Sequence, residues 1–186
     1  MIKKTAIMVF APGYEEVEAL SAVDLLRRAE VAVKMVSLNG EAEVTSSHGV
    51  TLRMDGSFSD VLDELADAVI LPGGMPGTTY LRQNENLKNY IIQMNEKKKI
   101  VAAICAAPTV LLDCGIVFEK KVTSYPSFEN EFKDSNYLID SVVVDENIIT
   151  SRGVGTALEF GLVLVEKLVS KETSDKIRTG IVLASR

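Results

Sequence analysis

One cysteine stands where an apolar run meets a predicted helix. Cys105 lies in the stretch "VAAICAAPTVL", residues 101–111, in which Pro108 suits the first turn of a helix. Alanines on both sides leave room for the sharp strand-to-helix turn that exposes a nucleophile. A thiol there would lie near a helix N-terminus, whose partial positive charge favours the thiolate. The alternative, from spacing alone, is that Cys105 is a small buried hydrophobic residue.

Three glutamates, Glu15, Glu16 and Glu18, fall in the first turn of a helix predicted over residues 15–29. Acids at this place usually complement the helix dipole, which is a sufficient reason for Glu15 and Glu16. Glu18 shares a face with Glu15 and stands next to apolar residues, and both like charge and partial burial raise the pKa of a carboxyl group. A Glu18 carboxyl that is protonated near neutral pH could donate a hydrogen bond to a thiolate.

Glycines mark two further loops. In "LPGG", Gly73 and Gly74 follow a predicted buried strand, and their backbone N–H groups could face an oxyanion. The alternative is a plain tight turn. The stretch "SRGVGT", residues 151–156, joins a strand to a helix but lacks the lysine of a P-loop and the third glycine of a dinucleotide fingerprint. A nucleotide cofactor is therefore not expected. A metal site is not expected either, because the two cysteines and the histidine are dispersed along the sequence.

The elements that position these loops alternate between strands and helices. Strands are expected at about 5–10, 31–38, 67–72, 99–104 and 147–153, and helices at about 15–29, 86–96 and 156–169. Hairpins are expected at 43–55, turning at 47–49, and at 137–151, turning at 145–147. This alternation predicts a three-layer α/β/α sandwich of flavodoxin-like type with a mostly parallel sheet. Ligands bind such sheets at the carboxyl ends of the strands, where the loops "APGYEEVE", "LPGGMPG" and "ICAAP" are expected to converge.

Composition narrows the class of protein. The 186 residues fit one domain, 1–186, and the net charge of −6 argues against nucleic acid or an anionic membrane as a main partner. No apolar run approaches the roughly eighteen residues of a membrane span, so a cytoplasmic protein is expected. Cys105 and Cys114 are predicted on one helix, about 13 Å apart, which is beyond the about 7 Å that a disulfide allows. Both should be free thiols.

Five motifs together resemble those of one family. "GYEEVE", "LPGGMPG", "AAICAAPTVLL", "KVTSYP" and "TSRGVGTALEF" occur in the order and spacing of the DJ-one/ThiJ/PfpI superfamily, and are most similar to its DJ-one branch. The resemblance implies that Cys105 is a reactive, oxidation-sensitive cysteine and that Glu18 is the acid that hydrogen-bonds it. It also implies that Gly73, Gly74 and Ala106 supply backbone donors around the cysteine.

The chain departs from the family pattern in its histidines. Many relatives carry histidine after "KVTS", where this chain has Tyr125. Peptidases of the superfamily have histidine directly after the cysteine, where this chain has Ala106, so a triad peptidase or glutaminase is poorly supported. Tyr125 could donate a hydrogen bond but is a weak base near neutral pH. His48, the single histidine, lies in a predicted hairpin turn and matches no catalytic position of the family, and a site role, for example across a dimer interface, is the alternative.

The resemblance implies an activity on reactive carbonyls. Cys105 would attack the aldehyde of methylglyoxal or of an early glycation adduct, as in a glutathione-independent glyoxalase or protein deglycase that acts in oxidative and carbonyl stress. No cofactor is implied. The alternative is a non-catalytic redox sensor or redox-regulated chaperone that uses the same cysteine. Members of the family are similar in forming homodimers through the helix at 15–29, whose apolar residues surround nearly its whole circumference.

Overall fold

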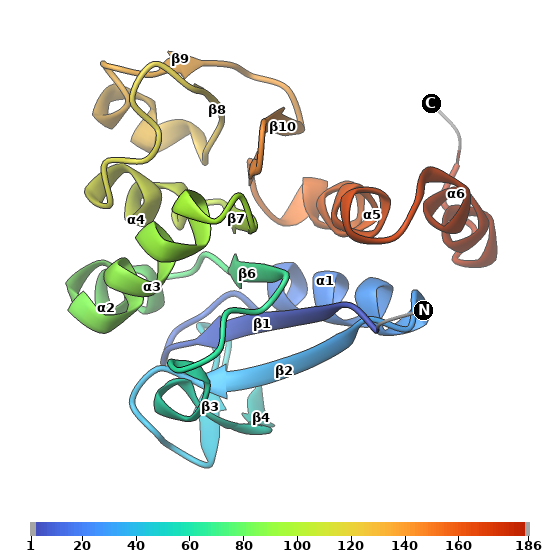
Figure 1. The fold of residues 1–186 in the computed structure, drawn as a ribbon, viewed down its shortest axis with the longest axis horizontal. Coiled ribbons are helices and arrows are strands. Elements are labelled where there is room, and N and C mark those ends of the chain that lie inside the picture. The colour runs from blue at the N-terminus through green and yellow to red at the C-terminus, as the bar shows by residue number, and fades with distance from the viewer. Residues whose placement is uncertain (1–2, 185–186) are drawn as a thin grey trace.

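The apolar runs of the sequence pair into one central sheet. A computed structural model describes residues 3–184, and within them the sheet has seven strands in the order β10-β11-β7-β6-β1-β2-β5 (Figure 1). All neighbours are parallel except β10 and β11. The strands are β1 Thr5–Phe10, β2 Ala32–Ser37, β5 Gly56–Ser57, β6 Ala68–Leu71, β7 Ile100–Ile104, β10 Val142–Asp145 and β11 Ile148–Ser151. Most side chains of β1, β6 and β7 are fully buried because helices cover both faces.

Helices form the outer layers, with α1, α5 and α6 on one side and α2, α3 and α4 on the other (Figure 1). Their bounds are α1 Glu16–Arg28, α2 Gly77–Gln83, α3 Glu85–Glu96, α4 Pro108–Asp113, α5 Ala157–Leu168 and α6 Lys171–Gly180. Gly161 makes the contact between α1 and α5 close, because a Cβ atom there would lie 2.6 Å from Cδ1 of Leu25. The helix that carries Glu18 is thereby fixed against the helix that follows the "SRGVGT" loop.

Smaller elements complete the chain. They are the antiparallel pair β3 Glu43–Thr45 and β4 Thr51–Arg53, the parallel pair β8 Lys121–Val122 and β9 Asn136–Tyr137, and the 3-10 turns η1 Phe58–Val61, η2 Pro126–Glu131 and η3 Val154–Thr156. The β3–β4 and β10–β11 pairs are the two hairpins that the sequence predicts.

The fold class is confirmed, but some elements differ from those that the sequence predicts. The prediction of one helix carrying both cysteines is wrong, because α4 begins at Pro108, after Cys105, and Cys114 is its C-cap. Both thiols are nevertheless free, as expected. Helices α2 and α6 were not expected from the sequence. Within residues 3–184, no helix is long and apolar enough to cross a membrane.

Candidate active site

Cys105 occupies the turn between β7 and α4 in a strained backbone conformation. Its φ of +65° lies in the left-handed region, which residues other than glycine rarely adopt. The turn is held from both sides: the Cys105 N–H donates to the Ser151 carbonyl at 3.0 Å, and the Cys105 carbonyl accepts from the Tyr125 N–H at 2.8 Å. The structure therefore has the sharp strand-to-helix elbow that the sequence suggests, with the thiol at the carboxyl edge of the sheet.

Glu18 reaches the same point from the first turn of α1. Its side chain is only 1% exposed, and its Oε2 accepts a hydrogen bond from the Gly73 N–H at 2.9 Å. The carboxyl group also hydrogen-bonds the Cys105 thiol. Its other oxygen, Oε1, is buried without a hydrogen-bond partner among residues 3–184. Buried carboxyl oxygens are usually satisfied, so an orphaned one beside a thiol marks a functional arrangement.

The protonation of this pair follows from burial and charge. Burial raises the pKa of Glu18 to about 7, and the charge of Glu15 adds to this rise against the hydrogen bonds from Cys105 and Gly73. Burial, the Glu18 charge and the hydrogen bond to Glu18 raise the pKa of the Cys105 thiol to about 12. The N–H groups of Ala106 and Gly74 oppose this rise without reversing it. Burial first, and then the Glu18 carboxylate, thus favour the thiol form of Cys105 over the thiolate, and the N–H groups beside the sulfur do not offset them.

The two glycines of "LPGG", Gly73 and Gly74, have different structural roles. The expectation that the Gly73 N–H faces an oxyanion is wrong, because that N–H is donated to Glu18. Gly73 also allows the close approach of the pair, since a Cβ atom there would lie 2.6 Å from Cβ of Cys105. The N–H groups of Gly74, with a φ of +91°, and of Ala106 interact with the sulfur. A Cβ atom on Gly74 would lie 2.4 Å from the Glu15 nitrogen, so this position also tolerates glycine alone.

The thiol opens into a cleft of about 470 Å³. Its lining residues are Glu15, Glu18, Gly74, Cys105, Tyr125, Pro126, Arg152, Gly153, Val154, Gly155 and Thr156. Tyr125 is 49% exposed at the rim, where its ring lies close to Gly153. Arg152 was not expected in the site. The resemblance of the "SRGVGT" motif to that of the family implies that this loop shapes a wall of the cysteine pocket, and the lining of the cleft agrees with that expectation.

His48 lies outside the cleft. It occupies the β3–β4 turn with a largely exposed ring, and its Nδ1 lies 3.0 Å from Oε1 of Glu16. Against the effect of burial, the backbone N–H of Glu16 and the hydrogen bonds from His48 and Ser46 hold the pKa of the Glu16 carboxyl below its usual range. Ligand atoms of Glu15, Glu16 and His48 lie within 4.8 Å of one another, a grouping that the sequence spacing did not reveal. Within one chain, His48 contacts the start of α1 and not the thiol.

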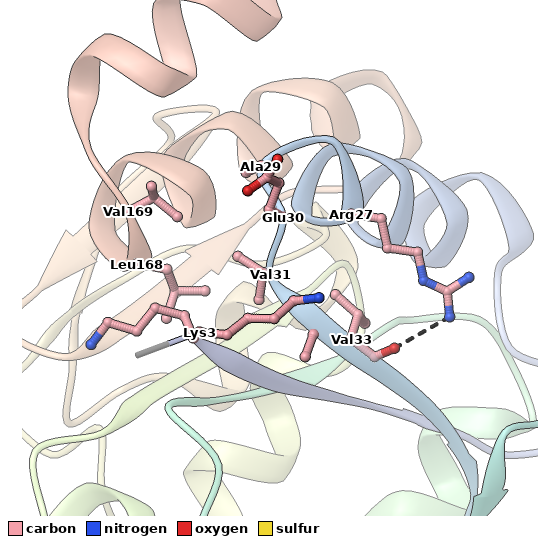
Figure 2. A pocket seen from close by; sticks show the side chains of 10 residues that line it. Lys3, Arg27, Ala29, Glu30, Val31, Val33, Leu168 and Val169 are labelled. Carbon is pink, nitrogen blue, oxygen red and sulfur yellow. Dashed lines mark hydrogen bonds between the residues drawn. The ribbon is translucent and has the colours of Figure 1, made fainter. Parts of the chain in front are cut away.

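A larger hollow, of about 920 Å³, lies at the opposite edge of the sheet, where β1 and β2 begin (Figure 2). Its walls are Lys3, Lys4, Arg27, Ala29, Glu30, Val31, Ala32, Val33, Leu168 and Val169. Arg27, in this wall, already has a partner within the chain, because its guanidinium donates a hydrogen bond to the Val33 carbonyl at 3.2 Å (Figure 2). The walls contain no cysteine or histidine, so the smaller Cys105 cleft is the candidate active site.

Known proteins are similar to this chain over nearly its whole length. The chain is 38% identical to protein dj-1beta of Drosophila melanogaster, over 98% of this chain and 99% of that protein. The crystal structure of Drosophila melanogaster DJ-1beta superimposes with a TM-score of 0.96 at 38% identity, covering 99% of this chain and 100% of that chain. The chain is also 32% identical, over 98% of both proteins, to a protein of Caenorhabditis elegans named glutathione-independent glyoxalase DJR-1.2. The sequence model of the DJ-1/PfpI family matches residues 3–167, and this chain belongs to that family.

Proposed function

We propose that this protein is a cofactor-independent glyoxalase that converts α-oxoaldehydes such as methylglyoxal to α-hydroxy acids. The observation that carries the proposal is the buried Glu18 carboxyl, with a pKa of about 7, in hydrogen-bond contact with the Cys105 thiol on its elbow. A base with a pKa near the working pH is the most effective one for moving protons in a transition state. The name of the Caenorhabditis elegans relative supports the same substrate class.

The first step is addition of sulfur to the aldehyde. Glu18 accepts the thiol proton while the Cys105 sulfur forms a bond to the aldehyde carbon, and this proton then passes to the former aldehyde oxygen, which gives a neutral hemithioacetal and restores the Glu18 carboxylate. The Gly74 and Ala106 N–H groups face the sulfur and stabilise the negative charge that develops beside it. Moving the proton to Glu18 removes the carboxylate charge that disfavours the thiolate, so proton transfer and attack assist each other.

The second step is an internal transfer between the two carbons of the substrate. Glu18 removes the hydrogen of the former aldehyde carbon as a proton and delivers a proton to the neighbouring carbon, while the hydroxyl proton of the first carbon moves to the oxygen of the second through an enediol. The first carbon is thereby oxidised to a thioester, and the second is reduced to an alcohol. Water then hydrolyses the thioester, which releases the α-hydroxy acid and restores the thiol. Electrons balance within the substrate, so no cofactor is required. Attack on an early glycation adduct would give a deglycase activity by the same first step.

Lactate formation tests this proposal. Purified protein with methylglyoxal and without glutathione is expected to form one equivalent of lactate for each equivalent of methylglyoxal consumed. Aldehyde loss without lactate would contradict the proposal, because simple trapping by the thiol consumes the aldehyde but forms no acid. We propose a cytoplasmic location, since the chemistry needs a free thiol and a reducing compartment preserves it.

Tyr125 is the position at which turnover should be improvable. Its side chain stands at the rim of the cleft, where many relatives have histidine, and its phenol is a weak base near neutral pH. Tyr125→His is expected to raise kcat for methylglyoxal, because a second group able to exchange protons typically contributes a factor of at least about 10². Tyr125→Phe is the matched control. A Tyr125→His rate equal to that of Tyr125→Phe would show that no base is missing.

Cys105 is expected to react with peroxide in preference to Cys114. Burial raises the pKa of both thiols to about 12, but only Cys105 lines the cleft and faces two backbone N–H donors. Cys114 instead lies at the C-terminal end of α4, with its sulfur 3.9 Å from the Lys88 carbonyl. Peptide mass spectrometry after mild peroxide should find two added oxygens on Cys105. Equal oxidation of Cys114 would mean that access and N–H donors do not govern the reaction.

A homodimer is proposed from the outer face of α1. Val17 is 45% and Leu20 is 36% exposed, and Val154 and Leu158, at the start of α5, are similarly exposed. Exposed apolar residues gathered in this way favour burial against a second copy, which two-fold pairing achieves self-complementarily. Leu20→Glu should convert the dimer to a monomer of 20.2 kDa in sedimentation at micromolar concentration. A parent protein that already sediments as a monomer would remove the proposal and any role of His48 across subunits.

A further inference from the structure

Arg152 has a guanidinium group with little to bind inside its own chain. It lines the Cys105 cleft and is the one lysine or arginine among the described residues that do so. Its single side-chain partner within residues 3–184 is Thr123, whose Oγ1 lies 3.5 Å from Nη1, the outer limit of a hydrogen bond. None of the ion pairs among these residues involves it. Since a guanidinium carries five N–H donors, most of them are free for a ligand.

The loop that carries Arg152 is held in place. Thr156 contacts the Ser151 hydroxyl at 2.7 Å, and its hydroxyl accepts from the Gly153 N–H at 3.1 Å. Ser151 is itself the last residue of β11, and its carbonyl accepts the Cys105 N–H. The base of the arginine and the nucleophile are therefore tied to the same strand end. A ligand group held by Arg152 would have a fixed relation to the carbon that Cys105 attacks.

We infer that Arg152 selects substrates that carry a carboxylate, so that the preferred substrates are α-oxoaldehydes with an anionic tail. This rests on the proposed function for the reacting end of the substrate and adds the chemistry of its other end. A guanidinium matches a carboxylate with two parallel hydrogen bonds, which gives both energy and orientation. The start of α5, directly after the loop, adds the positive end of a helix dipole to the same wall.

The acids in the cleft do not cancel this preference. Glu15 is 8% exposed, and its Oε2 accepts the Glu18 N–H at 2.7 Å as the cap of α1. Its charge is therefore partly satisfied by the helix N-terminus. Glu18 hydrogen-bonds Gly73 and the thiol at the cleft floor, on the side of the reacting carbon. Arg152, with a partly exposed side chain, is the cationic group that the described lining offers to the distal end of a substrate.

A pair of alkylating reagents isolates the charge preference without requiring turnover. Iodoacetate and iodoacetamide react with a thiol in the same way, but only iodoacetate carries a carboxylate. The ratio of their rate constants at Cys105, measured by peptide mass spectrometry, should fall about tenfold or more in Arg152→Gln, the scale of one hydrogen bond between charged groups. The ratio for Arg152→Lys should lie between those of the parent and of Arg152→Gln, because lysine keeps the positive charge but loses the paired N–H donors of the guanidinium. Arg53→Gln, on the exposed strand β4, is the matched control and should keep the parental ratio.

The same comparison, between a charged and an uncharged compound, can be made for turnover with two substrates. The ratio of kcat/KM for γ,δ-dioxovalerate, an α-oxoaldehyde that ends in a carboxylate, to kcat/KM for methylglyoxal should also fall about tenfold or more in Arg152→Gln. If neither compound is converted but the alkylation ratio still falls, the glyoxalase proposal fails and the anion selectivity of Arg152 stands. If the alkylation ratio is the same in the parent and in Arg152→Gln, the inference is overturned, whatever the turnover.

Discussion

Glu18→Gln is expected to lower kcat for methylglyoxal by about 10²–10⁴-fold, and Cys105→Ala to abolish lactate formation. Glutamine keeps the shape of the side chain and can still accept the Gly73 N–H through its amide oxygen, but it cannot take a proton from the thiol. The loss is therefore specific to proton transfer. Cys105→Ala removes the atom that forms the covalent bond, so no comparable route remains.

The pH profile gives this prediction a second readout. Because Glu18 acts as a base, the parent is expected to lose kcat/KM as the pH falls through about 7, where the carboxylate becomes protonated. Glu16→Gln is the matched control, since Glu16 is the neighbouring acid that pairs with His48 and lies outside the cleft lining. An unchanged rate in Glu18→Gln, or a profile without an inflection near 7, would remove Glu18 from the mechanism.

Glu18→Gln is also expected to stabilise the fold at high pH. The pKa of Glu18 rises from 4.5 to about 7 on folding, so the folded state binds the proton more tightly than the unfolded state does. The stability that comes from this proton is complete below pH 4.5, decreases as the pH rises, and is lost above about 7. Glutamine does not titrate, so the variant escapes this loss. Between pH 5 and pH 8 the difference in unfolding free energy, variant minus parent, should grow by about 2.5 kcal/mol.

Urea unfolding at the two pH values measures that difference. The comparison with the parent at each pH cancels the other titrating groups, which both proteins share. Glu16→Gln again serves as the control, and it should show no gain at pH 8, because the Glu16 pKa lies below its usual value rather than above it. A difference that stays constant between the two pH values would mean that the buried carboxyl is not held protonated by its surroundings.

The sequence predicts the central sheet better than its covering. Runs such as β1 and β7 are apolar throughout because both faces are buried, and this composition is visible without any tertiary information. Helix α2 contains glycine and two threonines directly after Pro76, and α6 buries only Ser174, so neither has the apolar stripe that marks a helix. Their positions depend on the strands and helices against which they pack.

The sequence likewise predicts some features of the candidate site and not others. Cys105 and Glu18 could be named from residue type and family motif. The protonation of the thiol could not, because it depends on how close a distant carboxylate comes once both groups are buried. The predicted role of the Gly73 N–H was wrong for a related reason. One N–H donor can bind either the Glu18 carboxyl or the sulfur, and only the folded geometry decides which. The motif that contains Arg152 was expected in the pocket wall, but the few partners of its guanidinium could be seen only in the folded chain.

The two hydrogen bonds that flank Cys105 determine how the cleft can change over time. The residue follows an interior strand of the sheet, and its own N–H is donated to the end of β11, so this part of the backbone should open only with large-scale unfolding. Tyr125 and Arg152 extend from loops, where substitutions are tolerated because little packing depends on them. Substrate choice can thus diverge among descendants of one ancestral chain through these loops, while the position of the sulfur is inherited with the sheet.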